Sequence, residues 1–581
     1  MKALLEPLER IGRFDDLIRQ LKTNRGIVTV TGALDSQKAH LAAGLSEDAP
    51  FRLLIAENEL KAKELYEDFR LYDPEVLYYP AKDLIFYQAD ISGNLLTRER
   101  IRVIQAILER KNLTVVTSVG GCMDKLLALE VFQEHCIHLK NDSELDLEKM
   151  KRELVRLGYE REAQVESCGQ FSIRGGILDV FPLTEENPWR IELWGDEIDS
   201  IRSFDVESQR SIENLDEITI YPATEMLLTE KSIERGKKAI EKEAKRQTKY
   251  FRDQMLTEEG ARVAQNARDI CSLLDSGLDF TGAEQYLTYF YPDTVSFLDY
   301  FPENARIFLD EPNRILECAN TLTEEFRQSM SHRLEKGYLL PGQTDLMDET
   351  GVLCARLNRR NCVALCLMDV RKNEWKITGE YSVTVKSVNP YNNQFPVLVK
   401  DLKSWKHAGY QMVLVCPSRT RAQRMAQDLQ EEDLPAFYSE DPERILRPGE
   451  IMLIHGNVRR GFEYPMQKFV LITESDIFGK ERRKARKKSQ YSGQKIQNFS
   501  ELSVGDYVVH ENHGLGIYKG IEKIEVDHVM KDYVKIEYAG GSNLYVLATQ
   551  LDVLQKYSSA DAAKQAMLNR LGGQEWTKTK T

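Results

Sequence analysis

The N-terminal part of the chain alternates short apolar runs with longer amphipathic stretches, which is typical of an α/β fold. Between residues 26 and 120 the pattern predicts strands at 27–31, 52–55, 76–79 and 113–117 and helices at 59–72 and 97–110. Strands that alternate with helices in this way normally form a parallel sheet. A further apolar run at 306–309 ends in Asp310-Glu311-Pro312, and we expect the first sheet to resume there.

The pattern changes twice before that sheet resumes. Between residues 165 and 222, short stretches alternate apolar and polar positions, with turn signals at Gly175-Gly176 and Gly195-Asp196. This period of two predicts a β-rich domain inserted into the α/β unit. Residues 225–290 then have helical spacing and many charges, which predicts charged helices.

Two further units are predicted in the C-terminal half. Residues 350–475 form another α/β unit, with strands near 363–368, 411–416, 451–455 and 468–473 and a helix near 419–431. Residues 502–557 alternate at period two, which predicts a small β-barrel. We therefore expect a multidomain α/β and α+β chain that divides into a first α/β part (1–120), an inserted domain (121–222), a second α/β part (223–345), a small α/β domain (346–475), a basic linker (476–498), a β-barrel (499–557) and the start of a helix (558–581).

Composition and charge narrow the functional classes. Of the 581 residues 42% are hydrophobic and 29% charged, and no apolar run approaches the roughly 18 residues that span a bilayer. The N-terminus lacks an apolar export signal, so we expect a cytoplasmic protein with no membrane contact. The net charge of −13 argues against a chain that coats nucleic acid over its whole surface and favours protein partners. The segment 480–488 has seven bases and one acid, a net +6, and is either a solvated linker or a phosphate contact.

Cysteines and histidines give no sign of a metal or a disulfide framework. The nine cysteines are scattered and include no Cys-x-x-Cys pair, so we expect reduced, buried thiols. The nine histidines include no His-Glu-x-x-His and no zinc-ligand spacing, and we expect no structural metal. No nucleophile elbow of the form G-x-S-x-G is present either.

A phosphate-binding loop would lie directly after the strand at 27–31, and the sequence there is degenerate. A working G-x-x-x-x-G-K-[ST] loop needs its second glycine for close approach of the backbone to the phosphates, and a hydroxyl that binds magnesium. Gly32 and Lys38 keep the first glycine and the lysine, but Gln37 and Ala39 replace the second glycine and the hydroxyl. We predict that the Gln37 side chain obstructs the phosphate cradle and that the loop does not hydrolyse nucleotide.

Asp310 and Glu311 follow a buried strand, as does the acidic motif that holds magnesium beside a working loop. Without that loop they have little to act on. Two interpretations stay open, an ancestral remnant and a solvated strand end. Neither predicts catalysis, so we expect this chain to be catalytically inactive and to hold no cofactor.

Residues 169–210 carry the pattern R-G-(G/A)-x-x-D-x-F-P, followed by R-(I/L)-(E/D) and (G/D)-D-E-I-(D/E)-S-(I/L)-R. This pattern is very similar to the UvrA-binding domain shared by the excision-repair helicase UvrB and the bacterial transcription-repair coupling factors, the Mfd family. Together with the degenerate loop, the resemblance covers about residues 1–345. It implies a UvrB-like α/β domain with a degenerate P-loop and an inserted UvrA-binding domain, whereas residues 346–475 match only weakly and receive no function.

Residues 502–557 contain L-S-V-G-D-Y-V-V-H-E-N-H-G-L-G-I-Y-K-G-I and resemble the RNA-polymerase interaction module that the coupling factors share with CarD-type regulators. The resemblance implies a Tudor-like barrel. The family's usual L-Y-V-P ends in Leu547 here, so the proline that would stiffen the strand entry is absent. The two modules in this order are similar to the N-terminal half of a coupling factor. The last residues resemble the start of the helix that leads into the family's motor.

The resemblance assigns UvrA binding to Arg174, Arg190 and Trp194, with Glu192 beside them. Strand alternation supports a shared face independently, because residues 190, 192 and 194 point to the same side of one strand. An exposed Arg–Trp pair is also typical of an interface hot spot. The alternative is that Trp194 belongs to the core and that Arg190 only extends past it to solvent.

In the polymerase module, the resemblance assigns the contact with the polymerase β subunit to Ile524, between Lys523 and Glu525. In the family an apolar residue at this place lies on an exposed strand, which would suit edge-strand addition. The alternative is that Ile524 belongs to the core of the barrel.

The family's function would be transcription-coupled DNA repair: binding RNA polymerase stalled at a lesion and recruiting UvrA for nucleotide-excision repair. The resemblance implies that ATP, Mg and double-stranded DNA bind mainly to a missing motor, an ATP-dependent DNA translocase with a helicase-type, ATP-hydrolysing core. It also implies that a C-terminal domain masks the UvrA face, and we expect a monomer. Two other classes stay open: a UvrB-like helicase or nuclease subunit, which an intact loop would favour, and a CarD-type transcription regulator, which would leave the UvrB-like half unused.

Overall fold

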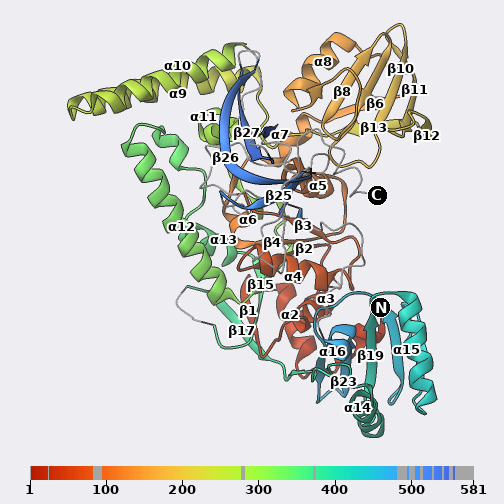
Figure 1. Cartoon of the computed structure of the whole chain (residues 1–581). Coiled ribbons are helices and arrows are strands. Elements are labelled where there is room, and N and C mark those ends of the chain that lie inside the picture. Colours follow the sequence, from red (N-terminus) through yellow and green to blue (C-terminus); the bar gives the residue numbers. More distant parts are fainter. Residues whose placement is uncertain are drawn as a thin grey trace.

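Several separate sheets make up the protein (Figure 1). The computed structural model describes residues 2–23, 25–46, 48–82, 94–276, 282–370, 374–479, 494–495, 504–510, 514–526, 529–539, 542–547 and 554–556. These residues form one seven-stranded sheet, three six-stranded sheets and two two-stranded sheets. The expected multidomain α/β organisation is confirmed, whereas the basic segment 480–488 and the expected final helix lie outside the described residues.

The first sheet is parallel throughout, with the order β17-β1-β16-β15-β2-β4-β3. Its strands are β1 (Gly26–Thr31), β2 (Phe51–Ala56), β3 (Leu77–Tyr79), β4 (Leu113–Ser118), β15 (Arg306–Asp310), β16 (Asn361–Cys366) and β17 (Ile377–Ser382). The sheet resumes at β15, as predicted. The strand predicted near 363–368 was assigned to the wrong unit, because it is β16 and lies between β1 and β15. The boundary expected at 345/346 therefore falls inside this sheet.

Alternate residues of the first sheet belong to two different cores. Ile27 packs into a core with the inserted domain, whereas its neighbour Val28 packs into a second core on the opposite face. This follows from strand geometry, since successive side chains point to opposite faces and both faces of a parallel sheet are normally covered. The second core also contains Val413 and Phe469 of the next α/β unit. The two α/β units are therefore joined through one continuous apolar core.

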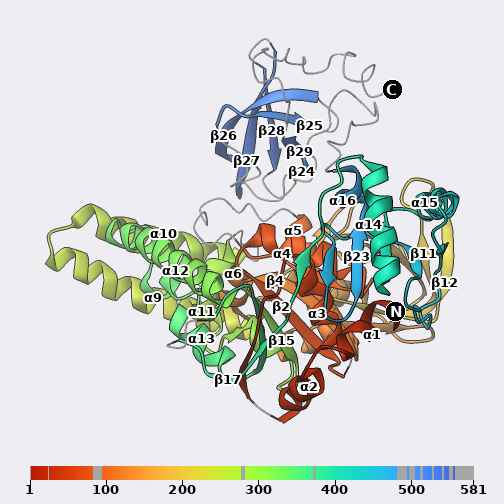
Figure 2. The same cartoon turned by 90° about the horizontal axis from the view of Figure 1, so that it is seen from below.

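The helices of the first unit cover both faces of its sheet. They include α1 (Lys2–Glu9), α3 (Gln37–Gly44), α4 (Glu59–Phe69), α5 (Asn94–Glu109) and α12 (Pro312–Glu335). A long antiparallel pair, α9 (Glu230–Asp253) and α10 (Thr257–Ser276), extends away from the rest of the molecule in both views (Figures 1 and 2). No helix among the described residues is long and apolar enough to cross a bilayer.

The inserted domain is built on a six-stranded sheet with the order β12-β11-β10-β9-β8-β7. Its strands are β7 (Glu160–Arg161), β8 (Gln170–Arg174), β9 (Ile177–Val180), β10 (Trp189–Trp194), β11 (Glu197–Phe204) and β12 (Ser211–Leu215), and α8 (Leu147–Arg156) accompanies them. A short pair, β6 (Ile137–Lys140) and β13 (Glu217–Ile220), brings the two ends of the domain together. Phe171, Leu178 and Ile191 bury one face of the sheet. The strands lie where the period of two predicted them.

The second α/β unit has the order β18-β22-β23-β19-β21-β20. Its elements are β18 (Lys386–Ser387), α14 (Phe395–Ala408), β19 (Gln411–Cys416), α15 (Arg419–Glu431), β20 (Ala436–Tyr438), β21 (Ile451–His455), β22 (Phe462–Tyr464), β23 (Phe469–Thr473) and α16 (Glu474–Phe478). Three of the four strands predicted for this unit are thus in it, and the fourth is β16.

The C-terminal strands pair in the order β24-β29-β25-β26-β27-β28, drawn in blue in Figure 2. They are β24 (Gln494–Lys495), β25 (Tyr507–His510), β26 (Gly514–Val526), β27 (Val529–Glu537), β28 (Asn543–Leu547) and β29 (Leu554–Lys556). All pairs are antiparallel, and Val508, Val534 and Ile536 are fully buried between them. The predicted β-module is confirmed as a sheet, and its closure into a Tudor-like barrel stays a prediction.

Candidate functional sites

Two arginines of the inserted domain converge on a buried carboxylate. Asp179 of β9 is 1% exposed and lies opposite Arg190 of β10 in the strand register. The Arg190 guanidinium donates from Nε to Asp179 Oδ1 at 2.7 Å and from Nη2 to Oδ2 at 2.8 Å. Arg174 of β8 donates from Nη2 to the same Oδ2 at 2.8 Å. Asp179 therefore holds both arginines in place. The hydrogen bond to Asp179 also raises the pKa of Arg190.

The two arginines differ in exposure. The Arg190 side chain is only 15% exposed, against 47% for Arg174. Arg190 lies over the Phe204 ring, 4.3 Å from its centroid, and also donates to Gln209 Oε1 at 2.9 Å. The expectation of an openly exposed Arg190 is therefore corrected. Its guanidinium group is covered by Phe204 of the neighbouring strand and is bound by Gln209 of the turn that follows.

Trp194 ends β10 with 84% of its surface exposed. The alternative that Trp194 belongs to the core is therefore wrong. Ile191 is fully buried, so Arg190, Glu192 and Trp194 lie on the opposite side of β10, as the alternation predicted. Glu192 is held by Arg202 of β11, which donates to its Oε1. An exposed tryptophan beside constrained charges is what an interface hot spot needs.

Asp179 and Arg202 were not predicted as part of this face. Asp179 is the acidic position of R-G-(G/A)-x-x-D-x-F-P, so the motif already contained the signal. Its role becomes visible only in the register, which places it between Arg190 and Ser172. Arg202 lies opposite Arg190 on β11, and only the strand pairing shows that it reaches Glu192.

Ile524 lies in the second half of β26, where its backbone pairs with Lys531 of β27. Strand β25 pairs only with Gly514–Ile517 at the start of β26. Among the described strands, the half of β26 that contains Ile524 therefore has one paired edge, formed by β27. The side chains of Lys523, Ile524 and Glu525 lie outside the described residues, so the choice between edge and core for Ile524 stays open.

Lys38 connects the loop after β1 with the end of β15. Its Nζ lies 2.6 Å from Asp310 Oδ1 and 2.7 Å from Glu311 Oε1, and the Lys38 side chain is 9% exposed. Burial alone would lower the pKa of Lys38, but the two carboxylates raise it overall. Both acids are held by the lysine and are partly exposed, at 17% and 25%, and the two interpretations of the pair stay predictions.

Gln37 faces into the protein and is fully buried. Its Oε1 accepts from the Leu34 amide at 3.1 Å, and its Nε2 donates to the Tyr464 hydroxyl of the second α/β unit at 2.7 Å. Other amides of the loop are also satisfied internally, since Gly32, Ala33 and Lys38 donate to carbonyl groups. These amides are the groups that would otherwise point at a phosphate.

The second unit holds the same loop from outside. The Arg460 amide donates to Ser36 Oγ at 3.2 Å, and Arg459 donates to the buried carboxylate of Asp68 at 2.7 Å. His40 of α3 lies between the Tyr464 hydroxyl and the Leu4 carbonyl, at 3.0 and 2.6 Å. Burial lowers the pKa of His40 to about 4, so this histidine is neutral near pH 7. The loop is therefore enclosed between the two α/β units.

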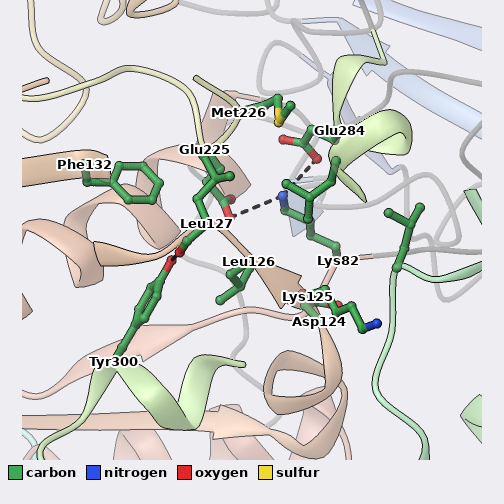
Figure 3. Close-up of a pocket in the computed structure, with 12 residues that line it drawn as sticks. Lys82, Asp124, Lys125, Leu126, Leu127, Phe132, Glu225, Met226, Glu284 and Tyr300 are labelled. Carbon is green, nitrogen blue, oxygen red and sulfur yellow. Dashed lines mark hydrogen bonds and ion pairs between the residues drawn. The ribbon is translucent and has the colours of Figure 1, made fainter. Parts of the chain in front are cut away.

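A cluster of buried charges lies where the inserted domain rejoins the first unit (Figure 3). Arg100 of α5 is 0% exposed and makes a bidentate pair with Glu225 at 2.7 and 3.0 Å. It also donates to Asp124 at 3.1 Å, while Lys82 lies 3.2 Å from Glu225 and 2.8 Å from Glu284. Burial raises the pKa of Asp124 to about 6. The cluster encloses a cavity of about 30 Å³, too small for an organic ligand, and we interpret it as an anchor for the inserted domain.

The described part of the chain contains neither a candidate metal site nor a disulfide bond. No group of three or more His, Cys, Asp or Glu side chains there could hold a metal ion. All nine cysteines are free, and six of them are buried.

Comparison with known families defines the class of this protein. A model of the UvrB interaction domain matches residues 137–226, which contain the Asp179 face. A model of the CarD-like/TRCF RID domain matches residues 502–558, which contain β25 to β29. The chain thus combines a UvrB interaction domain with a CarD-like domain, as the sequence motifs indicated.

Relatives extend this similarity to nearly the whole chain. It is 30% identical over 558 residues to the transcription-repair-coupling factor of Staphylococcus epidermidis, 31% over 568 residues to that of Bacillus subtilis, and 32% over 558 residues to that of Staphylococcus aureus. Each alignment covers 95% of this chain but only 47 or 48% of the relative, so the chain spans about half the length of these proteins. Over 95% of its length the chain is therefore similar to transcription-repair-coupling factors, and two of its domains match the UvrB interaction and CarD-like/TRCF RID families.

Proposed function

We propose that the protein acts in transcription-coupled nucleotide-excision repair, where it binds a stalled RNA polymerase and recruits UvrA. The observation that carries this proposal is the presence of a UvrB interaction domain and a CarD-like/TRCF RID domain in one chain. A CarD-type regulator would need only the second domain, and the first unit with its insertion would have no role.

The proposed UvrA-binding surface consists of Arg174, Arg190, Glu192 and Trp194. Trp194 supplies a large apolar contact that is free to pack against a partner. Asp179 and Phe204 hold Arg190 in one geometry, so little side-chain entropy is lost when it binds. Because Arg190 is mostly covered, we assign the larger direct contact to Trp194 and Arg174.

The proposed polymerase-binding surface is the second half of β26, with Ile524, Lys523 and Glu525. The edge of this half-strand that faces away from β27 pairs with none of the described strands, which supports strand addition to the polymerase β subunit. In such an interface backbone hydrogen bonds contribute affinity and alternate side chains contribute specificity. We further propose that the C-terminal sheet closes into a Tudor-like barrel around its buried core.

The loop after β1 is proposed to be a degenerate P-loop that neither holds nor hydrolyses ATP. The support is that Lys38 is bound to Asp310 and Glu311, where a working site would use lysine for phosphate and acid for magnesium. This disfavours a UvrB-like helicase or nuclease subunit with its own ATPase. ATP, Mg and duplex-DNA translocation are proposed for the whole protein, acting as a cytoplasmic monomer, and we assign them to the part of the coupling factors that is not matched by this chain.

The test is a titration of the chain with purified UvrA and, separately, with RNA polymerase. Trp194→Ala and Arg174→Ala should each weaken UvrA binding at least tenfold, since truncating an interface hot spot costs about 2 kcal/mol or more. Ile212→Ala is the matched control, because Ile212 is 56% exposed on β12 of the same sheet but outside the Arg–Trp surface. Polymerase binding should be unchanged in all three. Unchanged UvrA binding by both Trp194→Ala and Arg174→Ala would refute the residue assignment, and no binding of either partner by the parent chain would refute the function.

A further inference from the structure

The α9–α10 hairpin projects from the protein, and its base is closely packed. Gly236 of α9 lies against Phe290, so closely that a Cβ at this position would be 2.3 Å from the ring. Ile240, Ala244 and Phe251 are buried and turn one face of α9 toward the protein and α10. The hairpin therefore presents the opposite face of α9 to solvent in a defined orientation.

That outer face carries a stripe of five basic side chains, which we call the α9 basic stripe: Lys242, Lys245, Arg246, Lys249 and Arg252. All five are exposed; Lys242, Lys245, Lys249 and Arg252 follow one another at steps of three or four residues, and Arg246 lies four residues after Lys242 and three before Lys249, so the five share one side of the helix. At a rise of 1.5 Å per residue the stripe is about 15 Å long.

The stripe differs from the basic residues nearer the base of the hairpin. Lys238 pairs with Glu234 at 2.6 Å, and Lys237 pairs with Asp275. None of the five stripe residues has an ion-pair partner within the described ranges. Exposed Glu241 and Asp253 lie one turn from Lys245 and Lys249. The stripe and these two neighbours thus have five bases and two acids, a net +3, on a chain whose net charge is −13.

The composition of the stripe favours a nucleic acid over a protein partner. Protein interfaces normally have an apolar centre, but no apolar side chain is exposed between Glu241 and Lys249. Apolar exposure is confined to the tip of the hairpin, at Tyr250 (56%), Met255 (89%) and Leu256 (41%). Between Lys242 and Lys249 the cations have no exposed apolar neighbour, and Tyr250 adds an exposed ring at the end nearer the tip. A line of cations is complementary to an evenly charged polymer, and duplex DNA carries one charge per about 1.7 Å of its axis.

We propose that the α9 basic stripe binds the phosphate backbone of double-stranded DNA without sequence preference. The proposal rests on the proposed function in so far as a polymerase-bound repair factor works beside duplex DNA. It adds a contact made by the chain's own first unit, independent of any motor. Base-specific contacts are not expected, because lysine and arginine at a helix surface position a protein on phosphates rather than read sequence.

The experiment measures fluorescence anisotropy of a labelled 20-base-pair duplex titrated with the full chain from about 50 to 200 mM salt. Lys242→Gln/Lys245→Gln/Lys249→Gln removes three charges from the stripe. Lys400→Gln/Lys403→Gln/Lys406→Gln is the matched control, since these three lysines are exposed on α14 and the segment 480–488 is intact in both variants. The stripe variant should bind at least tenfold more weakly, and its slope of log affinity against log salt should fall by about 2.7, or 0.9 per lost contact.

A control variant that loses as much affinity and slope as the stripe variant would overturn the proposal, because it would show that only total charge matters. A stripe variant that binds DNA like the parent chain but loses RNA polymerase would also overturn it, and would indicate a protein partner instead. If the triple variant unfolds, the single Lys249→Gln should still reduce the slope by about 0.9, and Lys249→Arg should restore it. UvrA binding should be unaffected throughout, so failure of this proposal is distinguishable from failure of the proposed function.

Discussion

Replacing Lys38 with methionine removes the cation that Asp310 and Glu311 share. Methionine is unbranched and only one heavy atom shorter than lysine, so most of the apolar surface is kept and the main change is the loss of the charge. Two carboxylates then lie side by side without a cation, at a position where they are only 17% and 25% exposed, and Glu311 keeps only the Leu367 amide, which donates to its Oε1 at 2.9 Å. We expect the first α/β unit to lose stability, although nucleotide plays no part in the change.

The size of this loss follows from the geometry of the pair. Breaking a buried ion pair by removing one partner costs about 3–5 kcal/mol. The carboxylates retain some contact with water, and we therefore expect the lower end, about 3 kcal/mol. The raised pKa of Lys38 means that its contribution is fully present below the ordinary lysine pKa of 10.5 and is lost only as pH rises through the higher folded value.

The assay is urea unfolding combined with hydrogen exchange of the α3 amides, because a chain with several cores does not unfold in one step. Lys61→Met is the control: Lys61 lies nearby on α4 and pairs with Glu64 at 3.0 Å, but its side chain is 39% exposed. A surface pair of this kind contributes about 0–1 kcal/mol. Lys38→Met/Asp310→Asn/Glu311→Gln should regain most of the stability, because no uncompensated charge is left. Equal stability of Lys38→Met and Lys61→Met, or a triple variant weaker than Lys38→Met, would refute the reasoning.

Four further outcomes are expected. His40 should contribute stability that is lost as pH falls from its ordinary pKa of 6.5 to about 4, and His40→Gln should abolish that slope in urea unfolding. The pKa of Asp124 is raised, so its contribution depends on pH in the opposite direction: the free energy of unfolding should fall as pH rises from 3.8 to about 6. Asp124→Asn should remove this fall. Asp179→Asn should weaken UvrA binding at least tenfold, because Arg174 and Arg190 lose their common acceptor; normal binding with an intact fold would contradict this. Ile524→Arg should abolish polymerase capture but not UvrA capture, whereas unfolding of the C-terminal module would instead place Ile524 in its core.

Local periodicity predicted most of the strands but not the sheets to which they belong. Residues 361–366, Asn-Cys-Val-Ala-Leu-Cys, are apolar at nearly every position, which indicates a strand buried on both faces. These six residues do not indicate which strands pair with β16. Strand β16 pairs with β1 and β15 through backbone hydrogen bonds, which the side chains of the strand do not predict. We assigned it to the following unit only because it is close to that unit in the sequence.

For the candidate sites, too, the sequence predicted some features and not others. The motif around residue 174 located the proposed UvrA surface, and strand alternation placed Arg190 and Trp194 on one side of β10. The covering of Arg190 by Phe204 and Gln209 could not be foreseen, because it depends on the register of β10 with β11 and on the turn that follows. The same limit applies to Lys38, whose two acidic partners lie 272 and 273 residues further along the chain.

The central position of β16 also determines when the first sheet can fold during synthesis. Strand β1 (Gly26–Thr31) is synthesised before residues 361–382, which contain both of its neighbours, β16 and β17. Domains generally fold as units during synthesis, so the first unit has to wait for more than half of the chain before its sheet can close. Until then the edges and apolar faces of β1 are open to chaperones or to aggregation. A shortened protein that ends at residue 345 would lack β16 and β17, so both edges of β1 would remain unpaired with these strands.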